Sequence, residues 1–188
     1  MRNPFPPTLA LLSALALAHP ALAADYVQAP GSTLAFAGRY QGEVFTGAFP
    51  GFATRFSFDP ARLADARLEV TIPLATATTS NPDYDGELRG PAFLDSARFP
   101  RARYVATRFR ALGGNRYAAD GVLSLRGVDK PVTLEFAWTP GARPVLAGRA
   151  TVGRLAFGVG GGDWADTGLI PDAIAVSTRV VFAPANAE

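Results

Sequence analysis

Cysteine is absent from this 188-residue chain, and His19 is its only histidine. These two residue types supply many of the general bases, nucleophiles and transition-metal ligands of proteins. His19 lies in an amino-terminal segment with the features of a cleavable leader, so the rest of the chain has neither residue type. We therefore expect a protein that holds a molecule without catalysing a reaction on it. We expect no catalytic residue, no metal site and no cofactor in the enzymatic sense.

The amino terminus has the residue order of a secretory signal. Arg2 is followed by an apolar run over residues 9–18 and by the small-residue triplet Ala21-Leu22-Ala23. A membrane anchor is the alternative, but a bilayer span needs about 20 consecutive apolar residues, and this run is much shorter. We predict that residues 1–23 are a signal peptide removed before Ala24, and that the protein is exported.

The remaining residues 24–188 suit a single domain with one apolar core. Arg2 is the only charged residue of the leader, so the rest of the chain stays close to neutral, with its charges interspersed. A nucleic-acid-binding protein needs a clustered basic face. The charge pattern therefore argues against nucleic acid as a partner.

Apolar and polar residues alternate through most of the chain, which is typical of half-buried β-strands. The clearest case is Leu68–Leu74, where Leu68, Val70, Ile72 and Leu74 share one face. Similar segments cover residues 33–40, 52–58, 103–111, 117–125, 132–138, 146–152 and 174–182. Turn residues separate them, as in Gly113-Gly114-Asn115 and Gly127-Val128-Asp129. We predict an all-β fold of about eight antiparallel strands that closes into a barrel or forms a sandwich.

Residues 81–99 interrupt this alternation. Their spacing predicts one or two short helices, separated by Pro91. This connection is either a lid over one end of the barrel or an ordinary segment packed on its outside.

A second interruption of the alternation is the glycine-rich stretch 158–164. Because no lysine-containing phosphate motif or helix follows it, we interpret it as a turn, with Trp164 packing on or capping the barrel.

The chain has 13 phenylalanines, several of them on both faces of the region 45–58. A barrel of about eight strands can be just wide enough for one small ligand, and an aromatic lining would suit an apolar one. The same rings could instead fill the core. Composition leaves both interpretations open.

Four sequence elements resemble one known family. Residues 121–134 read GVLSLRGVDKPVTL; residues 45–60 end in Asp-Pro; residues 88–100 carry a Leu…Phe…Phe-Pro pattern; and residues 154–172 contain Arg, Phe-Gly-Val-Gly, Trp and Asp in order. Together they are similar to the YceI-like, polyisoprenoid-binding periplasmic proteins. The resemblance extends from about residue 26 to residue 182.

This resemblance implies a lipocalin-like antiparallel barrel in the periplasm, with an apolar tunnel that holds an isoprenoid lipid, either a polyprenyl chain or an isoprenoid quinone. Transient contact with inner-membrane proteins would fit such a role. The residues that we expect to contact the lipid are Phe36, Phe45, Phe49, Phe56, Leu88, Phe93, Tyr104, Leu125, Arg126, Leu134, Phe136, Arg154, Phe157 and Trp164.

Arg126 and Arg154 are the residues that we expect at the tunnel mouth, because a guanidinium offers a planar set of donors to phosphate or quinone oxygens. The alternative for each is a solvated surface charge. The family commonly has histidine at the position of Arg126 and near Gly42, and this chain does not. Contacts made by those histidines cannot be transferred here.

Two other function classes stay open at this point. A barrel filled by its own side chains would favour a non-catalytic module that docks on a respiratory or quinone-handling membrane partner. A histidine-free hydrolase would have to use a carboxylate pair such as Asp83 and Asp85, or Asp163 and Asp166. The size of the barrel interior distinguishes these two classes, because a carrier needs an empty apolar cavity and a docking module does not.

Overall fold

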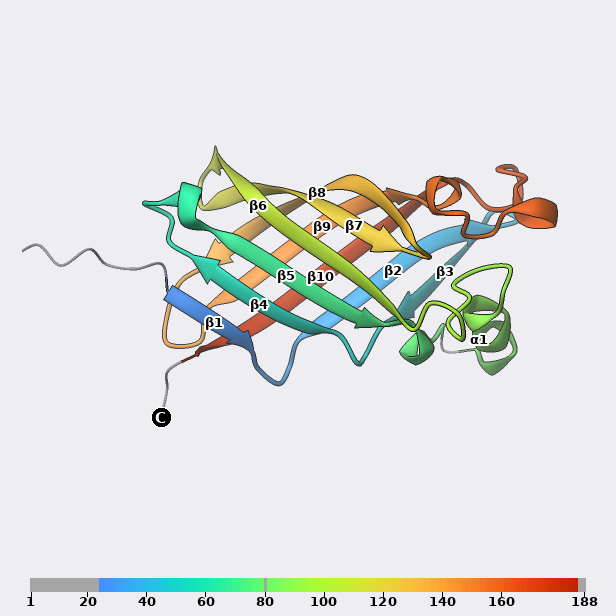
Figure 1. Ribbon diagram of the computed structural model, residues 1–188, viewed down its shortest axis with the longest axis horizontal. Coiled ribbons are helices and arrows are strands. Elements are labelled where there is room, and N and C mark those ends of the chain that lie inside the picture. Colours follow the sequence, from blue (N-terminus) through green and yellow to red (C-terminus); the bar gives the residue numbers. More distant parts are fainter. Residues whose placement is uncertain (1–23, 80, 186–188) are drawn as a thin grey trace, which may run out of the picture.

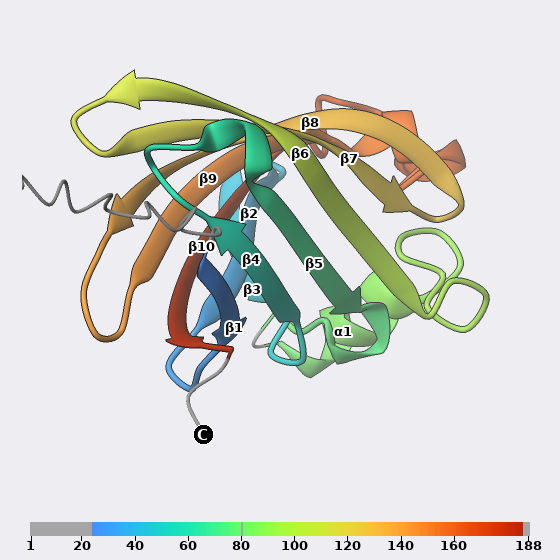
Figure 2. The same ribbon diagram turned by 60° about the vertical axis from the view of Figure 1, so that its left-hand side comes forward.

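Ten antiparallel strands form one sheet that closes into a barrel (Figures 1 and 2). The computed structural model describes residues 24–79 and 81–185. The strands are β1 (Ala24–Gln28), β2 (Thr33–Tyr40), β3 (Glu43–Ala48), β4 (Ala53–Phe58), β5 (Arg67–Pro73), β6 (Arg101–Gly113), β7 (Arg116–Leu125), β8 (Val128–Thr139), β9 (Val145–Gly153) and β10 (Ala173–Pro184). The predicted signal peptide lies outside the described residues.

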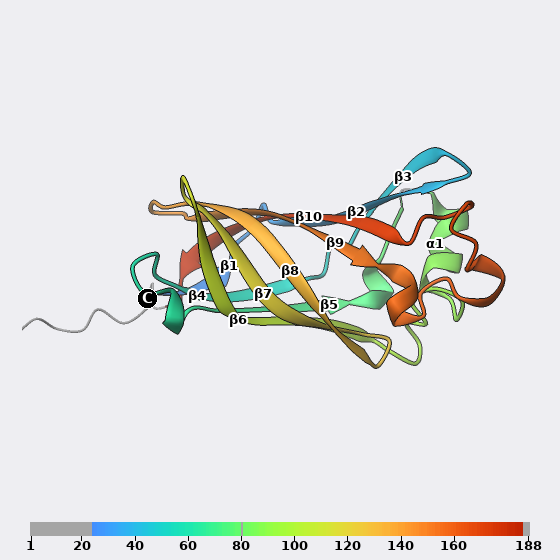
Figure 3. The same cartoon turned by 90° about the horizontal axis from the view of Figure 1, so that it is seen from above.

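Eight of these strands make the closed ring, in the order β1-β4-β5-β6-β7-β8-β9-β10, and β10 pairs with β1 to complete it. The predicted lipocalin-like antiparallel barrel is thereby confirmed. The long strand β10 pairs with β1 near its carboxyl end and with β2 over Ala175–Arg179. The β2–β3 hairpin therefore continues the wall beyond β1, and it extends toward the end of the molecule that carries the helix (Figure 3).

The connection between β7 and β8 is a two-residue turn formed by Arg126 and Gly127. Both residues have positive φ, 52° and 74°, as expected for the turn type that matches the twist of a β-hairpin. The turn thus begins one residue before the predicted Gly127-Val128-Asp129. A Cβ on Gly127 would lie 3.1 Å from the ring of Phe99, so a glycine also fits the packing there.

The helix α1 (Pro82–Arg89) lies in the segment where short helices were predicted. The side chain of Asn81 accepts a hydrogen bond from the backbone N–H of Asp83 (3.1 Å), and Pro82 occupies the first helical turn, so the helix has a well-formed start. Among the described residues α1 is the only α-helix, and turns follow Pro91. Short 3-10 turns cover Leu63–Asp65, Leu74–Thr76, Arg154–Phe157 and Gly162–Trp164.

The helix and the loop that joins β9 to β10 both lie at one end of the barrel (Figure 1). The opposite end, near β1 and the connection between β6 and β7, holds a cluster of packed aromatic rings. We call these rings the aromatic plug: Tyr26, Phe56, Phe58, Phe109, Tyr117, Phe136, Trp138 and Phe182. No helix among the described residues is long and apolar enough to cross a membrane.

Candidate ligand cavity

A cavity of about 360 Å³ occupies the half of the barrel nearest α1. Inward-facing residues of the strands form its wall. Its rim is formed by side chains of α1 and of two long connections, residues 90–100 between α1 and β6 and residues 154–172 between β9 and β10. Its volume lies within the range of roughly 300–1,000 Å³ that is usual for small-molecule sites. Most of its lining side chains are aliphatic or aromatic. The cavity can therefore exclude water from an apolar molecule.

The aromatic plug fills the barrel beyond the inner end of this cavity. Phe56 stacks on Phe58 with ring centroids 4.8 Å apart, and Phe136 and Trp138 pack edge-to-face on Phe56. None of the plug rings belongs to the cavity lining. The interior is thus filled at one end and hollow at the other, which makes it a blind cavity and corrects the expected tunnel.

Most of the residues that were expected to contact a lipid line this cavity. They are Phe36, Phe45, Phe49, Leu88, Phe93, Tyr104, Leu125, Leu134, Arg154 and Trp164. They come from strands on several sides of the barrel, from α1 and from both long connections. The barrel and its connections therefore gather these ten residues around one space.

Phe56, Phe136 and Phe157 do not line the cavity. Phe56 and Phe136 face inward, but the strand register places them in the aromatic plug. Phe157 belongs to the 3-10 turn after β9 and is only 2% exposed, packed within the main apolar core. These three rings contribute to the packing of the protein and are not positioned to touch a ligand in the cavity.

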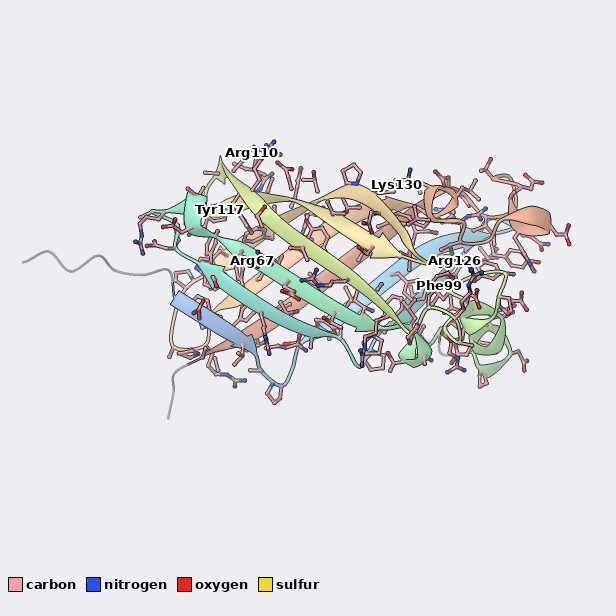
Figure 4. The ribbon with its side chains drawn as sticks, viewed as in Figure 1. Arg67, Phe99, Arg110, Tyr117, Arg126 and Lys130 are labelled. Atoms are coloured by element: carbon pink, nitrogen blue, oxygen red, sulfur yellow. The ribbon has the colours of Figure 1, made fainter. Side chains whose placement is uncertain are left out.

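Arg126 is not a free cation at the cavity mouth. Its Nη1 donates to the carbonyl oxygen of Pro91 (2.9 Å) and to that of Phe93. The side chain therefore fastens the connection after α1 to the β7–β8 turn, and Figure 4 shows Arg126 near Phe99 at this end of the barrel. Arg126 thus has a structural role at this end of the barrel, and it is not among the residues that line the cavity.

Arg154 lines the cavity, yet its guanidinium is also fully used. The side chain is 3% exposed, and all of its N–H directions are taken up by backbone carbonyls. Nε donates to Pro171 (3.2 Å), Nη1 to Val159 (3.1 Å) and Gly160, and Nη2 to Trp164 (2.8 Å) and Ile170 (2.7 Å). Arg154 therefore organises the loop between β9 and β10 and leaves no donor for a ligand.

Trp164 shapes the mouth of the cavity. Its ring packs against Phe93 of the connection after α1, at 5.4 Å between centroids, and against Tyr40 at the end of β2, at 6.3 Å. Gly160 makes this arrangement possible, because a Cβ there would lie 2.6 Å from Nη1 of Arg154, and its φ is +61°. The glycine-rich stretch is thus a turn, as predicted, and Trp164 caps the barrel.

Sequence reasoning missed Thr54, a polar residue in the cavity wall. Thr54 interrupts the inward row between Phe52 and Phe56, which was its only signal in the sequence. Tyr104 donates its hydroxyl to the carbonyl oxygens of Ala119 (2.8 Å) and Val132 (3.1 Å). Burial raises the pKa of Tyr104 above its ordinary value, so its hydroxyl stays protonated and keeps both bonds.

Asp85 fixes α1 to the strand-like segment before it. Its carboxylate accepts hydrogen bonds from the backbone N–H and hydroxyl of Thr79 and from the hydroxyl of Thr78 (2.8 Å). These bonds, led by the one from the Thr79 N–H, lower the pKa of Asp85 from its ordinary value. Asp85 thus has a structural role.

Within residues 24–79 and 81–185, side chains of His, Cys, Asp and Glu form no group that could hold a metal ion.

The lowered pKa of Asp85 gives the first testable prediction. Asp85→Asn should speed amide hydrogen exchange in α1 at pH 7, because the uncharged amide accepts these bonds more weakly. The stabilisation is fully present above the ordinary aspartate pKa of about 3.9 and is lost as the pH falls through the folded-state value. Exchange in the wild type should therefore approach that of the variant in acid.

Asp83→Asn is the matched control, because Asp83 lies two residues away and its carboxylate is exposed at the start of the helix. Exchange in α1 that changes equally in both variants would show that helix charge, and not the bonds of Asp85, sets the stability of this segment.

The fold and the cavity together define a class: a closed antiparallel β-barrel with one blind apolar cavity. A family model described as "YceI-like domain" matches residues 26–182. The chain belongs to the YceI-like family. This confirms the resemblance found in the sequence, and the matched residues reach from β1 to β10.

Relatives and solved structures agree with this assignment. The chain is 36% identical over 117 residues to a UPF0312 protein of Shewanella denitrificans, covering 60% of this chain and 61% of that protein. It is 32% identical over 166 residues to a UPF0312 protein of Pseudomonas fluorescens, covering 80% of this chain and 84% of that one.

The crystal structure of BcnA from Burkholderia cenocepacia superposes with a TM-score of 0.77 at 28% identity, covering 80% of this chain and 95% of BcnA. A polyisoprenoid-binding domain from Saccharophagus degradans superposes with a TM-score of 0.66 at 14% identity, covering 87% of this chain and 99% of that domain. At that identity, the second likeness concerns the fold alone.

Proposed function

We propose that this protein is a periplasmic carrier that sequesters an isoprenoid lipid, a polyprenyl chain or an isoprenoid quinone, without chemical change. The observation that carries the proposal is the blind cavity of about 360 Å³ with its largely apolar lining. Burial of apolar surface stabilises a complex by about 25 cal/mol per Å², so a long hydrocarbon chain gains much from such a site. The polyisoprenoid-binding domain of Saccharophagus degradans, which shares the fold, supports this ligand class.

The rim of the cavity suits a flexible hydrocarbon. Tyr40, Phe93 and Trp164 contribute aromatic faces from three different segments, and Leu88 adds an aliphatic side chain from α1. Aromatic rings bring a large contact area with few rotatable bonds, so they lose little conformational entropy on binding. The connection after α1 and the loop between β9 and β10 thus act together as the entrance.

The hollow half of the barrel favours carriage over docking alone. A docking module would be expected to fill its interior, and this barrel does so only in the aromatic plug. The acids considered for hydrolysis give no support to catalysis: Asp85 is engaged in hydrogen bonds to Thr78 and Thr79, and Asp166 accepts the backbone N–H of Gly168 (2.8 Å). Contact with an inner-membrane partner would then serve to load or unload the lipid.

Native mass spectrometry of the protein isolated from the periplasmic fraction tests the proposal directly. We expect a chain that begins at Ala24 and carries an added mass, which organic extraction identifies as an isoprenoid lipid. A protein that is found only in the cytoplasm would contradict the location, and a protein that neither retains an extractable lipid nor binds added farnesol would contradict the carrier function.

Filling the cavity gives the second testable prediction. Val176 on β10 lines the cavity, facing Phe36 on β2 and Ala150 on β9 in register. Val176→Trp should weaken the binding of farnesol, a 15-carbon isoprenoid alcohol, by roughly fivefold to 150-fold, because the larger ring leaves less room for the ligand and overpacking costs roughly 1–3 kcal/mol. Displacement of a fluorescent apolar probe measures the affinity.

Ser177→Trp is the matched control, because Ser177 is the next residue of the same strand and its side chain is exposed. It should leave the affinity for farnesol unchanged. Equal affinities in the two variants would show that farnesol binds somewhere other than the cavity.

A further inference from the structure

The outer edge of β3 carries backbone groups without partners. Ala48, the last residue of the strand, donates its N–H to the carbonyl oxygen of Thr78 (2.8 Å) and accepts the N–H of Thr78 (3.0 Å). This bridge is isolated, so the chain after Thr78 does not continue along β3. Residues two apart on an antiparallel strand direct their N–H and C=O groups to the same side. Val44 and Thr46 therefore point theirs away from β2, and within residues 24–79 and 81–185 no hydrogen bond satisfies them there.

The sheet ends at this edge, in the hollow half of the barrel. At the plug end the ring closes because β10 pairs with β1, whereas nearer to α1 the same strand pairs with β2, and β3 is the last strand. Phe45 of β3 lines the cavity, as do Tyr84 and Leu88 of α1. Figure 3 shows the β2–β3 hairpin and α1 at the same end of the molecule. A strand added to β3 would thus lie beside the mouth of the cavity.

Two large apolar side chains are exposed at this end. Val44 of β3 is 62% exposed and Tyr84 of α1 is 55% exposed, which makes them the most exposed large apolar residues of the described chain. Natural edge strands commonly carry lysine, proline or a bulge that prevents pairing with another chain. The sequence of β3, EVFTGA, has neither lysine nor proline, and its pairing with β2 is regular. The edge is therefore open to a further strand.

The charges beside this edge indicate the chemistry of a partner. The β2–β3 hairpin and α1 together carry four acids and two arginines: Glu43, Asp83, Asp85 and Glu87, and Arg39 and Arg89. Three of the acids, Glu43, Asp83 and Glu87, are exposed, and no ion pair of the described residues involves them. The excess negative charge attracts a basic segment and repels a second copy of the same edge.

We propose that the free edge of β3 is a docking site for an extended, basic segment of a partner protein, which adds to the sheet as a further strand. The segment alternates apolar and basic residues. Its apolar side chains extend the wall beside Phe45, and its basic side chains face solvent and the acids of the edge. This docking goes beyond the carrier function and does not require it, whereas a role of the partner in loading lipid through the adjacent mouth rests on that function.

Two blocked heptapeptides test the docking: one alternates lysine and valine, and the other alternates glutamate and valine. Added to the isotope-labelled full mature protein, the lysine peptide should shift the amide NMR signals of β3 and slow hydrogen exchange at Val44 and Thr46. It should bind at least about fivefold more tightly than the glutamate peptide. Its affinity should fall roughly threefold when NaCl is raised from about 50 to 500 mM, because salt screens exposed charges.

Thr46→Pro tests whether the backbone of the edge makes the contact. Proline removes the outward N–H of Thr46, and since that N–H points away from β2, no bond of the existing sheet is lost. The variant should bind the lysine peptide roughly twofold to tenfold more weakly, the value of one backbone hydrogen bond. Thr46→Val keeps the N–H and is the matched control, with the affinity of the wild type. The melting temperatures of both variants report whether the fold is intact.

Glu43→Lys tests the charge of the edge without a change in the backbone. Glu43 is the exposed first residue of β3, and its reversal should lower the preference for the lysine peptide over the glutamate peptide at least about twofold. Glu135→Lys is the matched control, because Glu135 is exposed on β8 in the outer wall of the barrel. It should keep the preference of the wild type.

Four results would overturn the docking site: signal changes confined to other strands, equal binding of the two peptides, a folded Thr46→Pro protein that binds the lysine peptide as the wild type does, or a Glu43→Lys protein with an unchanged preference. A concentration-dependent dimer that Thr46→Pro dissociates would also overturn it, because a second copy would then occupy the edge. A wild type that binds the lysine peptide but not farnesol contradicts the carrier function alone.

Discussion

Phe56→Ala should lower the free energy of unfolding by about 3–5 kcal/mol, the range for removing a fully buried aromatic ring. Phe56 is 1% exposed and lies at the centre of the aromatic plug, in contact with the rings of Phe58, Phe136, Trp138 and Phe182. Its loss removes these ring contacts and leaves a space that the stiff barrel wall cannot close. Urea unfolding followed by tryptophan fluorescence measures the change.

The same substitution should also lengthen the cavity. Phe56 follows Thr54 on the inward face of β4, so it is a plug ring that adjoins the hollow half. With its ring removed, the affinity for a 20-carbon isoprenoid alcohol should rise relative to that for farnesol. Arg55→Ala, on the outward face of the same strand, is the control and should change neither property. An unaltered chain-length preference would show that the plug does not limit the site.

The plug illustrates what the sequence predicts and what it leaves open. Alternation identified the inward faces of Phe56–Phe58 and of Val132–Trp138, and it yielded the barrel. It did not show whether a given inward ring lies at the filled or the hollow end, because residues four apart on one strand face the same interior at different depths. The depth depends on the register between strands, which brings Tyr117 opposite Phe136 far from the helix (Figure 4).

The hydrogen-bond partners of the two arginines could not be predicted from the sequence, for a different reason. Arg126 and Arg154 bind backbone carbonyl oxygens, and every residue has such an oxygen whatever its side chain. The partners of these arginines therefore leave no pattern in the sequence.

Strand β1 was not predicted, because its five residues are too few to show an alternation of apolar and polar residues. Its place in the ring depends on pairing with β10 at the other end of the chain.

Arg154→Met should lower the free energy of unfolding by at least about 3 kcal/mol, since hydrogen bonds to a charged group contribute roughly 1.5–3 kcal/mol each and the five bonds of this side chain are lost together, although their contributions do not add in full. Burial lowers the pKa of Arg154, but a guanidinium stays charged in proteins, so the wild-type bonds persist at neutral pH. Thermal unfolding measures the loss of stability. Hydrogen exchange should locate it in residues 158–171.

Arg154→Lys should rescue only part of this loss, because an ammonium has three donors and lacks the planar fork that reaches carbonyls on several sides. Arg149→Met, on the exposed face of β9, should be neutral. Since Arg154 holds the carbonyl of Trp164, its loss should also displace the ring that caps the mouth and weaken the binding of farnesol. An Arg154→Met protein with unchanged exchange in residues 158–171 would show that Phe93 and Tyr40 hold Trp164 in place without the guanidinium.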